Sequence, residues 1–222
     1  ITDEGSTHQP AALCVAPAYC SDAHREVTRQ APPSQPAVLP DGRLLFVEDE
    51  RRVRIRVAAE EVHDAGVTSS NAASRILALL VDPFFDSNRF VRVAWIDDSD
   101  PGRRALSITR YREVDNRLGD PAAVIASLPI PGDGDPHIVQ DDKGRIYIAV
   151  RADGRATRER IDHGGEVLRF AADGRTWAAG LGAPGFARAF VEPDALAFDR
   201  SSARLWLTGR DHDGSPALQS VA

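Results

Sequence analysis

The sequence is poor in several features, and each shortage narrows what the protein can be. It contains no methionine, not even at position 1, so we expect a processed or partial chain. It has no run of about 18 apolar residues, the length that a membrane-spanning helix needs, so we expect no transmembrane segment. No G-x-S-x-G motif indicates a serine hydrolase, and no N-x-[ST] motif offers an acceptor for N-glycosylation.

Lysine is almost absent as well. Lys143 is the only lysine among the 27 basic residues, and the others are arginines. The arginines are scattered along the chain and the net charge is −6, a combination that disfavours nucleic acid as a partner. The 42% hydrophobic content is enough for a core, and the 27% charged content argues against a wholly disordered chain.

The only two cysteines are Cys14 and Cys20. The five residues between them fit neither a C-x-x-C redox pair nor a haem-attachment motif. Paired cysteines in a loop-rich segment of an exported protein usually form a disulfide, which we predict here, with two free thiols as the alternative. The pair indicates a periplasmic or extracellular protein.

The chain divides into two parts by composition and periodicity. Residues 1–36 contain five prolines and no sustained periodicity, so we expect an irregular arm. Residues 37–222 consist of short apolar runs separated by turn residues. Within them, Val53, Ile55 and Val57 alternate with arginines, which is typical of a β-strand with one buried face. The sequence therefore predicts an all-β second part.

The apolar runs repeat. An arginine stands before a strand in four similar segments, at Arg43, Arg89, Arg145 and Arg204, with spacings of 46, 56 and 59 residues. Spacings of this size are typical of the four-stranded blades of a β-propeller. We expect the hairpins 75–97, 137–152 and 194–210 to supply central strands of successive blades, with the tryptophans of these strands packed in the core or between blades.

Several segments resemble the soluble quinoprotein glucose/sorbosone dehydrogenase family. They are LPDGRLLFVEDERRVRIRV, RILALLVDPFFDSNRFVRVAW, GGEVLRFAADG and EPDALAFDRSSARLWLTGRDHDG, which occur in the family's order over about residues 37–214. The resemblance implies a six-bladed β-propeller that binds pyrroloquinoline quinone (PQQ) and calcium and oxidises sugars. About half to two-thirds of such a ring is present in this chain.

The family's catalytic positions are mostly replaced. The position of the catalytic histidine corresponds to Asp133, and those of the Arg-Asn pair correspond to Val191 and Glu192. His137 lies four residues from the expected base. The resemblance also places Arg210, Asp211 and His212 at the mouth of the central channel, so these three and His137 are candidate binding residues. A solvated polar loop is the alternative, because loops at the ends of a propeller are commonly polar. No cofactor is predicted at the replaced positions.

A metal site is a second candidate in the same region. Asp133, Asp135, Asp141 and Asp142 surround His137, and carboxylates are the ligands that calcium prefers. The spacing lacks the order of known calcium loops, and turns between strands are commonly rich in aspartate. Polar turns are therefore the alternative interpretation.

Three hypotheses about function follow. The first is a non-catalytic, extracytoplasmic propeller that acts as a binding or scaffold subunit of a larger assembly. The second is a PQQ-dependent sugar dehydrogenase whose remaining cofactor residues lie outside this chain, with PQQ and calcium as cofactors. The third is a lactonase-like hydrolase with a metal held by channel carboxylates. We expect other subunits or a continuation of the chain to complete the ring and to cover Leu196, Phe198, Leu205 and Leu207.

Overall fold

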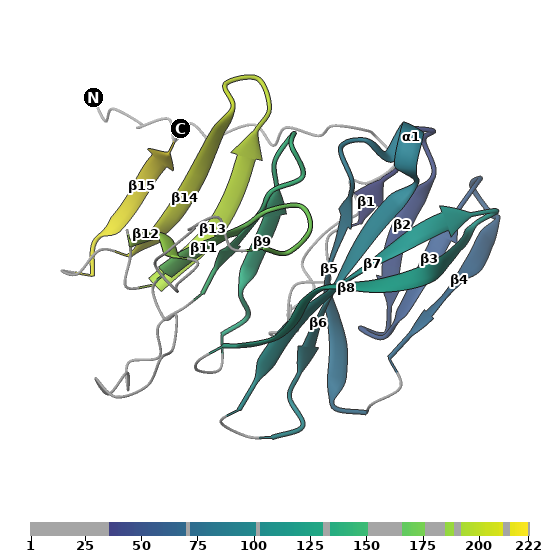
Figure 1. The fold of residues 1–222 in the computed structure, drawn as a ribbon, viewed down its shortest axis with the longest axis horizontal. Coiled ribbons are helices and arrows are strands. Elements are labelled where there is room, and N and C mark those ends of the chain that lie inside the picture. Colours follow the sequence, from purple (N-terminus) through teal and green to yellow (C-terminus); the bar gives the residue numbers. More distant parts are fainter. Residues whose placement is uncertain are drawn as a thin grey trace, which may run out of the picture. The chain divides into compact units, whose positions relative to one another are not determined.

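A computed structural model describes residues 36–69, 72–100, 103–130, 134–150, 166–175, 185–188, 192–210 and 214–221 (Figure 1). The described residues are almost entirely β-strand, with a single short helix, α1 (Phe85–Asn88). The predicted all-β class is thus confirmed. Of the predicted arm, residues 1–36, only Pro36 belongs to the described residues. The predicted disulfide between Cys14 and Cys20 lies outside them.

The strands in the described ranges form four antiparallel sheets, which we name A to D in chain order. Sheet A contains β1 (Ala37–Val38), β2 (Leu44–Glu48), β3 (Arg52–Arg56) and β4 (Val62–Thr68). Sheet B contains β5 (Ser74–Val81), β6 (Phe90–Asp97), β7 (Ala105–Val114) and β8 (Arg117–Pro129). Sheet C contains β9 (His137–Gln140), β10 (Ile146–Ala149), β11 (Glu166–Phe170) and β12 (Gly185–Arg188). Sheet D contains β13 (Glu192–Asp199), β14 (Arg204–Arg210) and β15 (Pro216–Val221).

Each sheet follows the order of its strands in the chain, so each is a simple meander. The first strands β1, β5, β9 and β13 contact one another in series, as the inner strands of propeller blades do. The predicted hairpins correspond to β5–β6, β9–β10 and β13–β14 in successive sheets. One detail differs from the prediction, because the first strand of each hairpin lies at the edge of its sheet and only the second is central.

Aspartate closes the first hairpin of every sheet. In all four, one carboxylate oxygen accepts a hydrogen bond from the backbone N–H two residues further on, which stabilises a tight turn. The acceptor–donor pairs are Asp41–Arg43 at 3.2 Å, Asp82–Phe84 at 2.9 Å, Asp141–Lys143 at 2.9 Å and Asp199–Ser201 at 2.9 Å. The turn residues in the sequence repeat therefore have a direct structural role.

Three apolar clusters join neighbouring sheets. Val91 and Val93 of β6 pack with the core of sheet A, whereas Ala94 and Ile96 of the same strand pack with sheet C. Ile146 and Ile148 in turn face sheet B. The central strands are buried on both faces because a sheet lies on either side of them, and this explains why their sequences are almost continuously apolar. Each fully buried aliphatic side chain contributes roughly 1.5–3 kcal/mol to stability.

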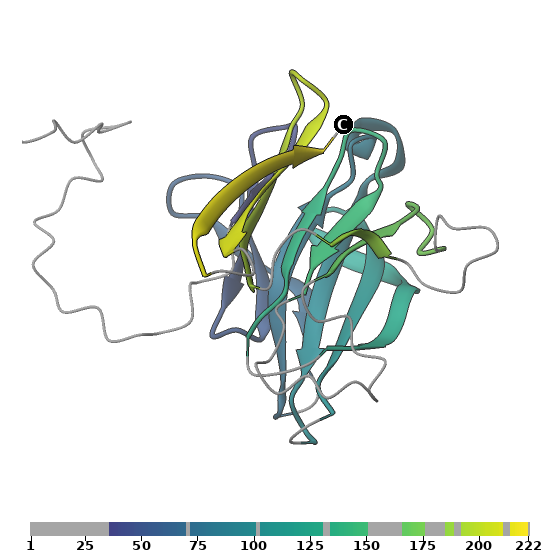
Figure 2. The ribbon, with the colours of Figure 1, turned by 90° about the vertical axis from the view of Figure 1, so that its left-hand side faces the viewer.

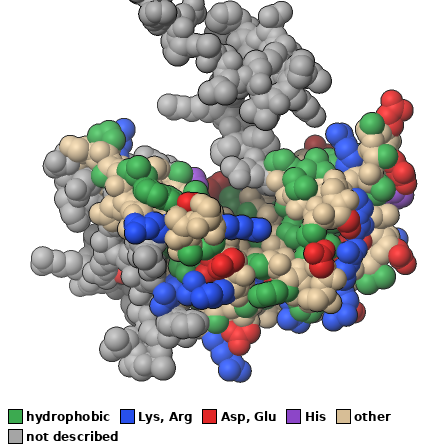
Figure 3. Space-filling view, turned by 90° about the horizontal axis from the view of Figure 1, so that it is seen from above, with side chains coloured by type: hydrophobic (Ala, Val, Ile, Leu, Met, Phe, Trp, Pro, Cys, Tyr) green, Lys and Arg blue, Asp and Glu red, His purple; other side chains and the backbone are tan. Residues whose placement is uncertain are grey.

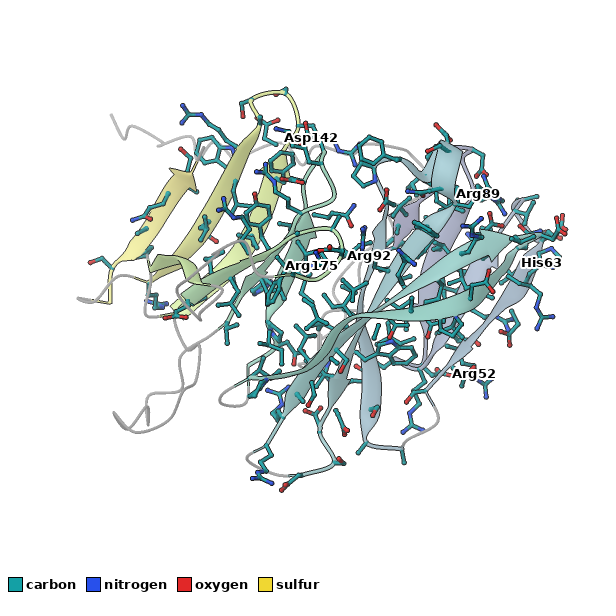
Figure 4. All side chains as sticks on the ribbon, in the orientation of Figure 1. Arg52, His63, Arg89, Arg92, Asp142 and Arg175 are labelled. Atoms are coloured by element: carbon teal, nitrogen blue, oxygen red, sulfur yellow. The ribbon has the colours of Figure 1, made fainter. Side chains whose placement is uncertain are left out.

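A buried arginine crosses between sheets B and C. The side chain of Arg92 on β6 is only 2% exposed and forms an ion pair of 2.9 Å with Asp82 in its own sheet. It also donates hydrogen bonds to the Gln140 side chain and, at 3.2 Å, to the Ala172 carbonyl of sheet C. Figure 4 shows Arg92 in the region between the strands of these two sheets. This contact connects the two sheets through polar bonds in addition to apolar packing.

The structure corrects which face of sheet D is uncovered. Leu196, Leu205 and Leu207 are buried, because they pack against Tyr147, Ala149 and Val167 of sheet C, and Phe198 is half-buried against the same cluster. These side chains therefore need no further covering blade. The opposite face carries Trp206, which is 37% exposed rather than packed in a core. Trp95 is half-buried against the cluster between sheets A and B, as expected.

In the part of the chain that the structure describes, no helix is long and apolar enough to cross a membrane. On the face seen in Figure 3, acidic and basic side chains are interspersed among hydrophobic ones.

Gly174 provides a test of how sheet C packs on sheet B. It has a φ of +84°, and a Cβ atom built there would lie 1.7 Å from the carbonyl oxygen of Val124 on β8. We expect Gly174→Ala to lower the free energy of unfolding by about 1–2 kcal/mol for the left-handed backbone and by roughly 1–3 kcal/mol more for the overlap. Urea denaturation followed by circular dichroism measures the loss.

Gly214→Ala is the matched control. Gly214 has a similar φ of +82°, but nothing lies within 4 Å of a Cβ atom built there. Its replacement should cost only the backbone contribution. Equal losses in the two variants would contradict the close approach of Gly174 to β8.

Candidate functional site

The loop that precedes β9 contains the sequence-predicted residues Asp135 and His137. Asp135 is half-buried and forms ion pairs with Arg75 and, at 2.9 Å, with Arg104 of sheet B. Both arginines also pair with Asp98, at 3.3 Å and 2.6 Å respectively. Two arginines and two aspartates thus form one network, which we call the B–C edge network.

The ends of three strands position this network. Arg75 is the second residue of β5, Asp98 directly follows β6, and Arg104 directly precedes β7. These three positions are close together because Asp97, the last residue of β6, lies opposite Ser74 of β5 on one side and opposite Ala105 of β7 on the other. Arg104 also donates a hydrogen bond of 3.0 Å to the Gly134 carbonyl. The network therefore holds the loop before β9 against the edge of sheet B.

The electrostatics of Asp135 follow from this arrangement. Burial alone would raise its pKa, but hydrogen bonds and charge from Arg75, followed by those from Arg104, outweigh burial, and the pKa is lowered. Asp135 is therefore ionised at neutral pH and neutralises neighbouring guanidinium groups. With two cations and two anions, the network is balanced in charge and does not attract an ion of either sign strongly.

Asp141 and Asp142 lie at the other end of β9. Asp141 is fully buried, accepts backbone hydrogen bonds from Lys143 and Arg145 at 2.9 Å and 2.8 Å, and pairs with the Arg145 side chain. The Tyr147 hydroxyl also donates to it, at 3.3 Å. Asp142 is exposed in the same turn. Asp141 is thus a structural residue of the hairpin, as the polar-turn interpretation predicts.

The candidate metal ligands are not brought together. Asp135 precedes the start of β9 and Asp141 follows its end, and six residues of extended chain span about 20 Å. One ion cannot bind both side chains. No group of three or more potential ligands converges anywhere among the described ranges, and Asp133 lies outside them. Asp135 and Asp141 therefore do not ligate one ion together, and a role of Asp133 in metal binding stays a prediction.

Among the described residues, the remaining candidates are His137 and Arg210, at matching strand ends of sheets C and D. His137 is half-buried and opens β9 opposite Ala149. Arg210 ends β14 opposite Glu192, the first residue of β13, and donates a hydrogen bond of 3.1 Å to the Gly214 carbonyl. The backbone thus places the Glu192 position next to Arg210, at the edge that corresponds to the B–C edge network. Val191, Asp211 and His212 fall outside the described residues.

Sequence reasoning missed Arg75, Asp98 and Arg104. Their only signal in the sequence is a charged residue at each strand end, in SRILALLVD and in DDSDPGRRAL. Such a signal does not reveal which strand ends meet, because the four side chains come from positions up to 60 residues apart. Only the pairing of the strands brings them together.

Comparison with known proteins gives the fold. The chain matches no family model and no curated protein sequence. Among solved structures it resembles a glucose dehydrogenase with 21% identity and a TM-score of 0.67, covering 84% of this chain and 64% of that one. The apo form of the soluble aldose sugar dehydrogenase from Escherichia coli matches with 18% identity and a TM-score of 0.66, covering 84% and 59%.

A PQQ-bound aldose sugar dehydrogenase from Streptomyces coelicolor matches with 23% identity and a TM-score of 0.62, covering 85% of this chain and 59% of that one. The fold is therefore that of the β-propeller glucose dehydrogenases, as the sequence motifs predict. The chain spans about three-fifths of the length of these structures. The predicted half to two-thirds of a ring is confirmed.

The B–C edge network predicts how stability depends on pH. Because the pKa of Asp135 is lower in the folded chain than in the unfolded one, the ionised carboxylate stabilises the fold above the unfolded pKa, about 3.9. This contribution is lost as the pH falls through the folded pKa. We expect Asp135→Asn to reduce the free energy of unfolding by about 1–2 kcal/mol at pH 7 and to weaken its decline below about pH 4.

Urea denaturation between pH 7 and pH 3 measures both effects. Asp142→Asn is the control, because Asp142 is exposed and belongs to no ion pair within the described ranges. An Asp135→Asn variant with the stability and acid sensitivity of the unmodified protein would show that the network contributes nothing.

Proposed function

We propose that this protein is a non-catalytic, exported propeller subunit that binds another protein. One observation carries the proposal: the fold of the glucose dehydrogenases is retained while the residues at the family's catalytic positions are Asp133, Val191 and Glu192. Oxidation of a sugar by a quinone needs a base for the hydroxyl proton while hydride moves to the cofactor. Asp133 stands where the family has its histidine base, and Val191 cannot supply the positive charge of the family's arginine.

The charges of the B–C edge network support the same proposal. PQQ carries three carboxylates, so a site for it needs an excess of positive charge. The arginines of the B–C edge network face Asp98 and Asp135, and their charge is already neutralised. Glu192 adds an acidic residue where the family has an amide. The residues present at this edge therefore do not fit PQQ.

Export and partners are part of the proposal. The expected disulfide of Cys14 and Cys20 supports a periplasmic or extracellular location, because disulfides persist in oxidising compartments. Retention of buried, aliphatic sheet interfaces without the catalytic residues supports a role that depends on the surface of the fold rather than on chemistry.

A second candidate function is a PQQ-dependent sugar dehydrogenase. The similarity to a PQQ-bound aldose sugar dehydrogenase favours it, and the chain spans only part of that structure. Cofactor-binding residues supplied from outside the 222 residues would then form the site, and bound PQQ would accept the hydride of the sugar. His137 and Arg210 would then be the candidate ligand contacts among the described residues.

Titration with PQQ and calcium separates the two functions. We expect no saturable binding by calorimetry and no dye reduction in the presence of aldoses, because the cationic and basic positions are replaced. The Streptomyces coelicolor enzyme serves as the positive control for both measurements. Stoichiometric PQQ binding together with aldose-dependent dye reduction would overturn the non-catalytic proposal in favour of the dehydrogenase.

A further inference from the structure

Phe90 and three arginines share the face of sheet B that turns toward sheet C. Phe90 and Arg92 stand two residues apart on β6, and β7 places Arg112 opposite Phe90 and Arg110 opposite Arg92. The guanidinium carbons of Arg110 and Arg112 lie 4.2 Å and 5.2 Å from the centroid of the Phe90 ring. Contacts of this kind hold a guanidinium against an aromatic ring. We call these four residues the Phe90 cluster.

The positive charge of the Phe90 cluster exceeds the negative charge beside it. Arg92 pairs with Asp82 at 2.9 Å, whereas neither Arg110 nor Arg112 forms an ion pair with a carboxylate in the described ranges. Burial lowers the pKa of Arg92, and the charge of Arg110 opposes Asp82 by lowering it further. The Nε–H of Arg92 is also buried without a hydrogen-bond partner among these residues. The cluster therefore has two uncompensated charges and lacks acceptors.

Other arginines that connect strands or sheets have carboxylate partners. In the part of the chain that the structure describes, these paired arginines are Arg43, Arg75, Arg89, Arg104 and Arg145. Arg110 is half-buried as well, but its printed neighbours are Arg92 and the Phe90 ring. Because a partly desolvated cation without a counter-charge is unfavourable, a bound anion would stabilise this position.

The outer strand leaves room beside the two unpaired arginines. Gly119 of β8 lies opposite Arg112, and Ala122 lies opposite Arg110, so both arginines face small residues across the strands. Paired residues of neighbouring strands point to the same face of the sheet. Nothing lies within 4 Å of a Cβ atom built at Gly119. Arg112 itself is exposed, so a ligand can reach this side of the cluster.

The Phe90 cluster lies at the other end of sheet B from the B–C edge network. Phe90 opens β6 directly after α1, whereas Asp98 follows the end of β6, and eight residues of extended chain span about 26 Å. Figures 1 and 2 both show α1 at the upper end of sheet B and the loop between β6 and β7 at its lower end. The two clusters are therefore separate.

We propose that the Phe90 cluster binds an oxyanion that carries two negative charges on one group, such as the phosphate of a phosphate monoester. Each guanidinium presents planar pairs of N–H donors that match the oxygens of such a group. A phosphate monoester carries about −1.5 to −2 charge at pH 7, which matches the two unpaired arginines, whereas a carboxylate carries only one. This site goes beyond the proposed function, because it depends neither on a protein partner nor on PQQ.

Calorimetric titration of the full chain with glycerol 2-phosphate tests the proposal. We expect saturable binding of one molecule per chain. Arg110→Gln and Arg112→Gln should each weaken it about tenfold or more, because a hydrogen bond to a charged group commonly contributes that much. Arg110→Gln removes repulsion from Arg92, so it should unfold at a urea concentration no lower than the unmodified protein. Absence of saturable binding, or an unchanged affinity in both variants, would overturn the site.

Two controls separate a specific site from general attraction to positive charge. Arg200→Gln removes the same charge from an exposed position in the turn between β13 and β14, and it should leave the affinity unchanged. An equal loss in Arg200→Gln and in the two cluster variants would overturn the assignment to the Phe90 cluster. Acetate should not bind measurably, and binding of acetate as tight as that of glycerol 2-phosphate would overturn the preference for a doubly charged group.

Discussion

The guanidinium of Arg92 is a buried polar contact that links sheet B to sheet C. It lies 2% exposed between sheets B and C, paired with Asp82 on one side and bonded to Gln140 and Ala172 on the other. Burial lowers the pKa of Arg92 and the nearby Arg110 lowers it further, while Asp82 opposes both. A charge in this environment is tolerated only when its partners are in place, so the register of sheet C on sheet B is specified by polar geometry as well as by apolar area.

The rest of the stack follows from that register. Sheet D packs on the face of sheet C that carries Tyr147, and sheet B packs on the opposite face of sheet C. At the edge of the same two sheets, Arg75 and Arg104 hold Asp135 and thereby the loop that leads into β9. Gly134 and Asp135 thus lie in a loop that is held by structural ion pairs.

A fold of this kind can be retained while the residues at its strand ends change. The apolar strands and the aspartate turns stabilise each sheet whether or not a ligand binds, whereas cofactor-binding residues contribute little to stability and can be replaced without loss of the fold. Under the proposed function, the charge-balanced B–C edge network and the acidic residue at position 192 would be such a change.

The sequence by itself determined the all-β class, the repeating hairpins and the aspartate turns, because these depend on residues within about ten positions of one another. Alternation in RVRIRV and the turn residues of DDKGR predict strands and tight turns directly. Only the tertiary structure decided which faces were covered and which charges met. One strand, β14, carries Leu205 and Leu207 on one face and Trp206 on the other. Sequence alone does not tell which of these faces meets sheet C. Likewise, Asp135 was a metal candidate by its neighbours in the sequence, but strand pairing placed it beside two arginines from sheet B, because contacts between sheets depend on register rather than on spacing along the chain.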